Sequence, residues 1–76
     1  MIAGKAIVYA TKACWLPERV PVKEAEWSFA DRPAMGTAFN VGEPIATVLA
    51  VGESSEFVNE RLRRGVVSLR RRLTQS

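Results

Sequence analysis

The sequence lacks several of the groups on which enzyme active sites depend. Its 76 residues include no histidine and a single cysteine, Cys14. The absence of histidine removes the commonest general base and the commonest metal ligand. One cysteine cannot form an internal disulfide or a cysteine-rich zinc site, and no histidine is present to activate its thiol. We therefore expect a buried, inert Cys14, no metal site and no catalytic residue in this chain.

Long apolar runs are also missing. No stretch reaches the roughly 18 consecutive apolar residues that indicate a membrane span. The first five residues do not begin a signal peptide, because Lys5 follows almost at once and no long apolar core comes after it. A free thiol without an export signal predicts a cytoplasmic location. The hydrophobic fraction of 47% and charged fraction of 25% are ordinary for a folded chain, so residues 1–76 are expected to form a single small domain.

Acidic residues are absent from the last part of the chain. Residues 1–60 carry five basic groups and all eight acids, a net charge of −3, whereas residues 61–76 carry six arginines and no acid, a net charge of +6. Together they give the overall charge of +3. The basic character therefore belongs to one C-terminal segment on an otherwise acidic chain.

Strand patterns occupy residues 2–51. The short apolar run from Ile2 to Ala10 predicts a strand that is covered on both faces. Residues 25–30 alternate, which places Ala25, Trp27 and Phe29 on one face of a half-buried strand. A third strand is predicted from Pro44 to Val51, ended by Gly52, and a weaker one at residues 37–39. Turns are expected at residues 31–36 and 41–44, and an irregular segment at residues 11–24, where Pro17 and Pro21 interrupt strand pairing.

The C-terminal third has a helical period. Ser54 or Ser55 is a good N-cap, and apolar residues recur every three or four positions at Val58, Leu62, Val66, Leu69 and Leu73. This spacing predicts one amphipathic helix over about residues 54–74. Gly65 costs about 1 kcal/mol relative to alanine in mid-helix, so it indicates close packing or a kink. The predicted class is α+β: a small antiparallel barrel or sandwich-like sheet with one long C-terminal helix.

The arginines of this helix are candidates for anion binding. The residues predicted to bind the anion are Arg61, Arg64 and Arg71. The guanidinium fork matches phosphate oxygens, and release of counterions favours binding to polyanions. Aromatic residues for base stacking are nearly absent from the segment, since Phe57 is the only one. A solvated helix face is therefore favoured over a nucleic-acid-binding module.

Loop residues supply the other polar candidates, Asp31, Arg32 and Glu43. An acid beside an arginine in a loop can bind a substrate carboxylate or phosphate. The same residues can also serve only to hold a turn in shape, because Asp and the following Pro33 both favour turns.

Two stretches of sequence resemble a known family. GKAIVYA at residues 4–10 and PIATVLAVGES at residues 44–54, with Leu16-Pro17 between them and a long helix after them, are similar to the C-terminal subdomain of ATP-grasp ligases. In biotin carboxylase and glycinamide ribonucleotide ligase this subdomain opens with a Gly-x-Ala strand. It later has a strand that ends in glycine before a polar residue and Ser/Thr, and it closes with a helix. The resemblance covers about residues 4–73 through short motifs.

The resemblance implies a non-catalytic accessory subdomain that packs on ATP-binding lobes and shapes the substrate side of the site. It also implies that the chain is part of something larger, because the family's Mg-ATP site lies mainly in the two preceding lobes. No cofactor is then expected in the isolated chain, and Mg-ATP belongs to the parent ligase. Biotin carboxylases have an arginine at the end of the first strand, where this sequence has Ala10, so carboxylase activity is not implied. Asp31 and its neighbours are where contact to substrate or lobes is expected.

Two further functions stay open. One is a small nucleic-acid-binding module that uses the helix from Arg61 to Arg72. The other is a homo-oligomeric structural domain, because the core of so small a chain often needs a partner surface.

Overall fold

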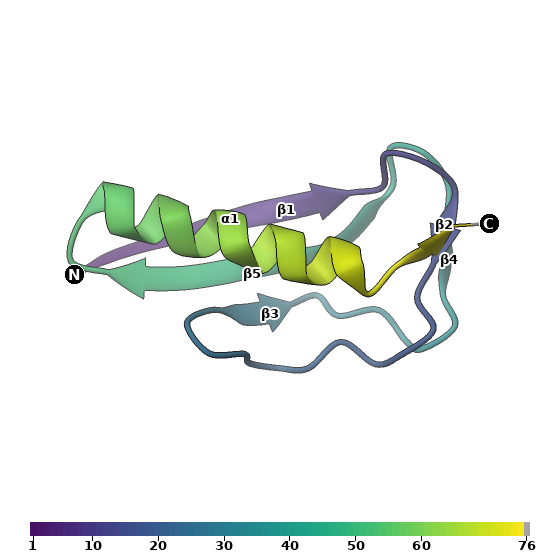
Figure 1. Cartoon of the computed structure of the whole chain (residues 1–76), viewed down its shortest axis with the longest axis horizontal. Coiled ribbons are helices and arrows are strands. Elements are labelled where there is room, and N and C mark those ends of the chain that lie inside the picture. The colour runs from purple at the N-terminus through teal and green to yellow at the C-terminus, as the bar shows by residue number, and fades with distance from the viewer. Residues whose placement is uncertain (76) are drawn as a thin grey trace.

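Two small antiparallel sheets and one helix make up the computed structural model, which describes residues 1–75 (Figure 1). Sheet A has the strand order β1-β5-β3. β5 pairs with β1 from Ile2 opposite Gly52 to Val8 opposite Ala46, but with β3 only through Thr47, Val48 and Leu49. The predicted first and third strands are confirmed. The bounds in sheet A are Ile2–Tyr9 for β1, Ser28–Ala30 for β3 and Pro44–Gly52 for β5.

Sheet B joins three distant parts of the chain through two-residue strands. Its order is β4-β2-β6, with β2 at Cys14–Trp15, β4 at Ala38–Phe39 and β6 at Thr74–Gln75. The weak strand signal at residues 37–39 is thus confirmed, whereas β2 lies in the segment that was expected to be irregular. A two-residue strand is too short to show an alternation of apolar and polar residues. Such strands therefore form only because tertiary folding brings their partners together.

The sheets do not close into a barrel. Closure requires the two outer strands of a sheet to pair with each other. In sheet A the outer strands β1 and β3 lie on opposite sides of β5. The α+β class is therefore confirmed, and the barrel expectation is wrong.

Helix α1 spans Ser55–Arg71 and begins as the sequence predicts. The Ser54 hydroxyl accepts a hydrogen bond from the backbone N–H of Phe57, which satisfies one of the free donors of the first turn. The expected end near residue 74 is wrong. The backbone N–H groups of Arg72 and Leu73 bond to carbonyls three residues earlier, and the chain then extends to pair Thr74 with Trp15. Pairing with β2 replaces the last helical turn.

The core lies between α1 and one face of sheet A. Val8 of β1 and Val48 of β5 point toward the helix and are 1% and 0% exposed, and Leu69 meets them from α1 at 0%. Gly65 is buried at the closest approach, because a Cβ there would overlap Val48 Cγ1 and lie 3.1 Å from Trp27 Cγ. Of the two roles considered for this glycine, close packing is confirmed, and α1 continues through it without interruption.

Two expectations about the strands are corrected. Strand β1 is not covered on both faces: Ile7 and Tyr9 are 46% and 47% exposed, because α1 covers one side only. The strand expected over residues 25–30 is limited to β3. Ala25 is exposed instead of facing inward, because the Glu24 N–H donates to the Trp27 carbonyl and residues 23–28 form a tight hairpin turn.

Replacement of Gly65 by alanine tests the close approach. A helical Gly→Ala change ordinarily gains about 1 kcal/mol, whereas overpacking a tight core costs about 1–3 kcal/mol or more. Val48 is fully buried and Trp27 is held by the hairpin, so the overlap cannot relax easily. We expect Gly65→Ala to lower the free energy of unfolding in urea by about 1–2 kcal/mol.

The matched control is Asn59→Ala, at an exposed position of the same helix. Alanine has the higher helix propensity there, so this variant should be as stable as the wild type or slightly more stable. A Gly65→Ala protein that gains stability like the control would show that the helix has room to move away from the sheet.

Candidate functional site

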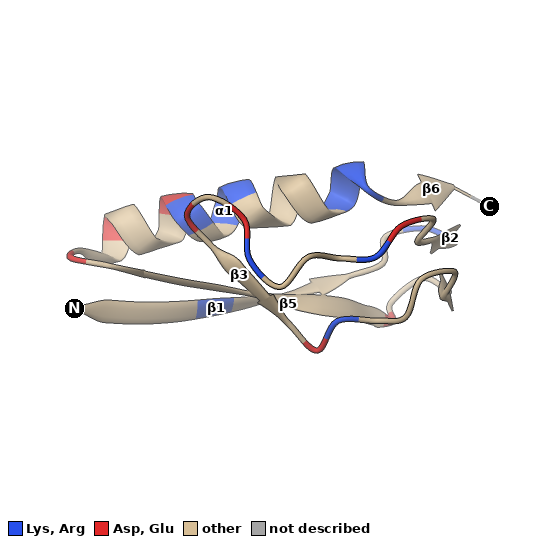
Figure 2. Cartoon of the chain, turned by 90° about the horizontal axis from the view of Figure 1, so that it is seen from below, with Lys and Arg blue, Asp and Glu red and all other residues tan. Residues whose placement is uncertain are grey.

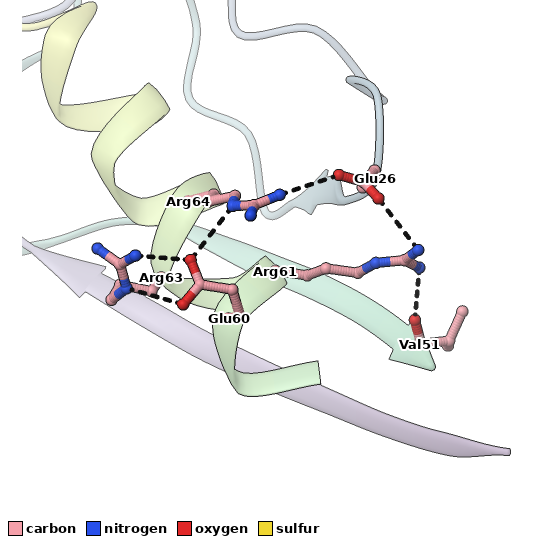
Figure 3. A network of polar contacts seen from close by, with 6 residues as sticks. All are labelled: Glu26, Val51, Glu60, Arg61, Arg63 and Arg64. Carbon is pink, nitrogen blue, oxygen red and sulfur yellow. Dashed lines mark hydrogen bonds and ion pairs between the residues drawn. The ribbon is translucent and has the colours of Figure 1, made fainter. Parts of the chain in front are cut away.

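The first candidate surface is a network of charges over α1. The hairpin at residues 23–28 folds across the helix and brings Glu24 and Glu26 to its arginines, as the red and blue segments of Figure 2 indicate. Glu26 binds Arg61 at 3.1 Å and Arg64 at 3.3 Å through its two oxygens. Glu60, on the helix itself, binds Arg63 at 2.6 Å and Arg64 at 3.2 Å, so that Arg64 joins the two carboxylates (Figure 3).

Arg61 also closes an open sheet edge. Because β3 pairs with only three residues of β5, the end of β5 has no strand beside it on that edge. The Arg61 guanidinium donates to the carbonyl of Val51 at 2.9 Å while its other nitrogen holds Glu26 (Figure 3). Its stem carries the guanidinium over the Phe57 ring, 4.3 Å from the ring centre, a favourable cation–π geometry. Arg61 therefore satisfies a backbone group that would otherwise be free to pair with another chain.

Glu24 is the most connected carboxylate. It accepts hydrogen bonds from Trp27 Nε1 at 3.2 Å and from the Ser68 hydroxyl, and it binds Arg72 at 2.9 Å. Partial burial by itself raises the pKa of Glu24, but the hydrogen bonds from Ser68, Trp27 and Arg72 together outweigh it and hold the pKa below its ordinary value. Hydrogen bonds and the charges of Arg63 and Arg64 likewise lower the pKa of exposed Glu60.

The arginines chosen from the sequence thus have different surroundings. Arg61 and Arg64 bind carboxylates of the same chain, and Arg70 donates to the Tyr9 carbonyl at 3.2 Å. Arg71 makes no hydrogen bond or ion pair with any residue in the range 1–75. Sequence reasoning missed Glu24 and Glu26 as partners, because they lie 35 or more positions from their arginines. The only local feature that could have indicated these partners is the presence of two acidic residues next to a turn.

The loop candidates do not gather into one cluster. The Asp31 carboxylate accepts from the Thr47 hydroxyl at 3.1 Å, and Arg32 donates to the carbonyl of Val20 at 2.9 Å. Glu43 accepts from the backbone N–H of Asn40 in the turn at residues 40–43. Asp31 has a positive φ of 52°, a conformation that Asp adopts more readily than most residues. Glu43 therefore stabilises its own turn, whereas Asp31 and Arg32 bond to segments far away in the chain. Asp31 also borders a hollow of about 270 Å³ with Ile7 and Thr47.

The second candidate surface is the side of sheet A that α1 leaves uncovered. In the strand register Ala3 lies opposite Val51, Lys5 opposite Leu49, and Ile7 opposite Thr47. Alternation along β1 places these residues on the face away from Val8, and Figure 2 shows no helix on that side of β1 and β5. Leu49 and Val51 are 36% and 47% exposed. Five residues form this open face of sheet A: Ala3, Lys5, Ile7, Leu49 and Val51.

A groove of about 510 Å³ adjoins this open face. Its walls are Leu49 and Val51 on one side and Ala25 and Trp27 of the hairpin on the other. The open face and this groove meet at Leu49 and Val51. Lys5 is the charged residue within the face, and the groove also has charged residues along it, Lys23, Glu26 and Arg61. An exposed apolar sheet face of this kind is suited to contact with another protein surface.

Comparisons with protein-family models, curated proteins and solved structures gave no match to the chain. Among residues 1–75, no helix is long and apolar enough to cross a membrane. The same residues contain no group of three or more side chains that could hold a metal ion. Cys14 is buried, as expected from its sequence context.

The hairpin–helix network predicts a loss of stability in acid. A carboxylate whose folded pKa is depressed contributes stability above its unfolded pKa, near 4.5 for Glu, and that contribution is lost as the pH falls through the lower folded value. We expect the free energy of unfolding to be nearly constant from neutral pH down to about pH 5, and to fall below about pH 4.5.

Glu24→Gln should lower the free energy of unfolding at pH 7 by about 1–2 kcal/mol, since it removes a charge that accepts three hydrogen bonds. The free energy of unfolding of this variant should also fall less steeply in acid than that of the wild type, which urea unfolding at a series of pH values would show. Glu18→Gln, at an exposed loop position, is the control and should behave as the wild type. Equal acid profiles for wild type and Glu24→Gln would mean that Glu24 does not hold the hairpin.

Proposed function

We propose that the chain is a non-catalytic accessory subdomain of an ATP-grasp-type ligase-like protein and acts in the cytoplasm. It packs through the open face on the ATP-binding lobes and shapes the substrate side of their site. The observation that carries the proposal is the one-sided sheet: α1 covers one face, while Ile7, Leu49 and Val51 on the other face meet water.

The proposal that the open face is a docking surface rests on the tendency of an apolar sheet face to be covered by another layer of protein. Domains are built of packed layers, and an apolar sheet face without a second layer indicates an interaction site. The resemblance at residues 4–10 and 44–54 falls on β1 and β5, the two strands that make the open face. The same segments therefore support both the family resemblance and the docking surface.

The position of Asp31 fits a role at the border of such an interface. Its carboxylate is fixed by Thr47 next to the hollow that Ile7 lines, at one end of the open face. A lobe packed on Ile7 would bring its own surface next to this exposed carboxylate. Arg32 is directed to the Val20 carbonyl, and Glu43 lies in a separate turn, so Asp31 is the loop residue best placed to contact substrate or lobe.

Docking on the open face can be tested by a substitution that introduces one charged side chain there. The coding sequence around this reading frame is expected to specify ATP-grasp lobes, in the same frame or in a neighbouring gene. When the lobes are produced as a separate chain, the wild type should co-purify with them. Val51→Glu should weaken that binding at least about tenfold, because it places an unpaired carboxylate in an apolar contact.

Val67→Glu is the matched control, since it changes an exposed valine on α1, on the other side of the sheet. It should leave docking unchanged, with folding of both variants checked by circular dichroism. Absence of an ATP-grasp gene near the frame, or equal docking by Val51→Glu and wild type, would refute the proposal.

A second copy of the chain is the other occupant that the open face favours, because the same apolar residues could pair across a two-fold axis. Equilibrium sedimentation separates the two functions. We expect a monomer across a wide concentration range. A concentration-dependent dimer that Val51→Glu abolishes would assign the open face to a homo-oligomeric structural role.

Mg-ATP should not bind to the isolated chain. The side chains of residues 1–75 do not supply a carboxylate cluster for Mg²⁺, and in the proposed arrangement the nucleotide belongs to the lobes. Isothermal titration with Mg-ATP is expected to give no binding heat. A micromolar dissociation constant would contradict the assignment of an accessory role.

A further inference from the structure

A second groove lies on the opposite side of the molecule from the open face. It has a volume of about 600 Å³ and runs between the hairpin and the last turns of α1. Arg63 and Arg64 line one end and Arg71 and Arg72 line the other, with Trp27, Val67, Ser68 and Glu24 between them. The structure thus places an aromatic ring among the arginines, which no sequence-local pattern indicates.

The groove retains positive charge after the internal pairs are counted. The network over α1 contains five guanidiniums, those of Arg61, Arg63, Arg64, Arg71 and Arg72, and three carboxylates, those of Glu24, Glu26 and Glu60. Two positive charges therefore remain. They are concentrated where Arg63 and Arg64 share Glu60, and at Arg71, which binds nothing among residues 1–75.

The spacing of these charges restricts the ligand. Arg64 and Arg71 are seven residues apart, nearly two helical turns, so they project from the same side of α1 about 10 Å apart along the axis. Val67, which is 38% exposed, lies between them, and Trp27 borders the groove. The site therefore has two cationic ends, and its middle combines the apolar Val67 and Trp27 with Ser68 and Glu24, whose carboxylate is bound to Arg72.

An extended peptide matches this pattern. Alternate residues of a strand face the same side, and residues four apart are about 13 Å apart, within reach of flexible arginine side chains. An acid, an apolar residue and a second acid at alternate positions would place carboxylates at both ends and the apolar side chain on Val67 and Trp27. A nucleic-acid strand fits less well, because Glu24 lines the groove and Glu60 binds Arg63 and Arg64 at one end, and both carboxylates oppose a continuous row of phosphates.

We propose that the groove between the 23–28 hairpin and the end of α1 binds an extended acidic segment of a partner protein, with two carboxylates flanking an apolar residue. Arg71 supplies one charge-assisted contact and Arg63 and Arg64 supply the other. This surface is separate from the open face, so its function does not depend on the ligase assignment.

The test uses the fluorescence of Trp27 in a Trp15→Phe background, which removes the only other tryptophan. The probe is a blocked peptide of sequence Asp-Thr-Leu-Thr-Asp. Its binding should change the emission of Trp27 and weaken as salt is added. Arg71→Ala should weaken binding about tenfold, the loss expected for one hydrogen-bonded ion pair, and Arg71→Lys should retain most of the affinity.

Arg19→Ala, a loss of equal charge at an exposed loop position, should bind the peptide as the wild type does. Because the Arg71 side chain makes no hydrogen bond or ion pair within residues 1–75, its replacement should leave the fold unchanged, which circular dichroism would verify. The proposal is overturned if Arg71→Ala binds like Arg19→Ala, or if the peptide with Asn in place of both Asp residues binds equally well. Tighter binding of a single-stranded oligonucleotide at the same salt concentration would assign the groove to nucleic acid instead.

Discussion

The close contact of α1 with β5 at Gly65 is the constraint on which the rest of the structure depends. Without a Cβ at this position, the helix backbone can approach Val48 and the ring of Trp27 can lie against it. Trp27 belongs to the hairpin, so its placement fixes residues 23–28 across the helix. Glu26 then reaches Arg61 and Arg64 on the helix, and Glu24 reaches Arg72 at its C-terminal end. One missing methyl group therefore permits both the core packing and the charge network.

The same contact gives the molecule two unlike sides. One layer of helix on a three-stranded sheet buries Val8, Val48 and Leu69, and within residues 1–75 no second helix covers the other face. The open face is therefore apolar and uncovered, while the helix side is charged and grooved.

The arginines illustrate how tertiary structure divides a uniform sequence feature. Six arginines without an intervening acid predict a single basic surface. In the folded chain Arg61 covers a strand edge and Arg64 links two carboxylates, whereas the Arg71 side chain forms no hydrogen bond or ion pair with the other described residues. Only part of the charge remains for a partner, and that part is placed at two points on one side of the helix.

The sequence by itself determined the α+β class, the two long strands, a serine N-cap at Ser54 or Ser55 and the apolar stripe of the helix. These features depend on local period and capping, which neighbouring residues specify. It did not predict the two-residue strands of sheet B, the end of the helix at Arg71 or the uncovered face of β1, because each depends on residues far away in the chain. The candidate sites divide in the same way: turn chemistry indicated Asp31, but only the tertiary structure brought Trp27 and Glu24 beside the arginines. Hydrogen bonds and ion pairs between distant residues leave no period in a sequence, so the fold alone decided which charges are satisfied and which are free to bind.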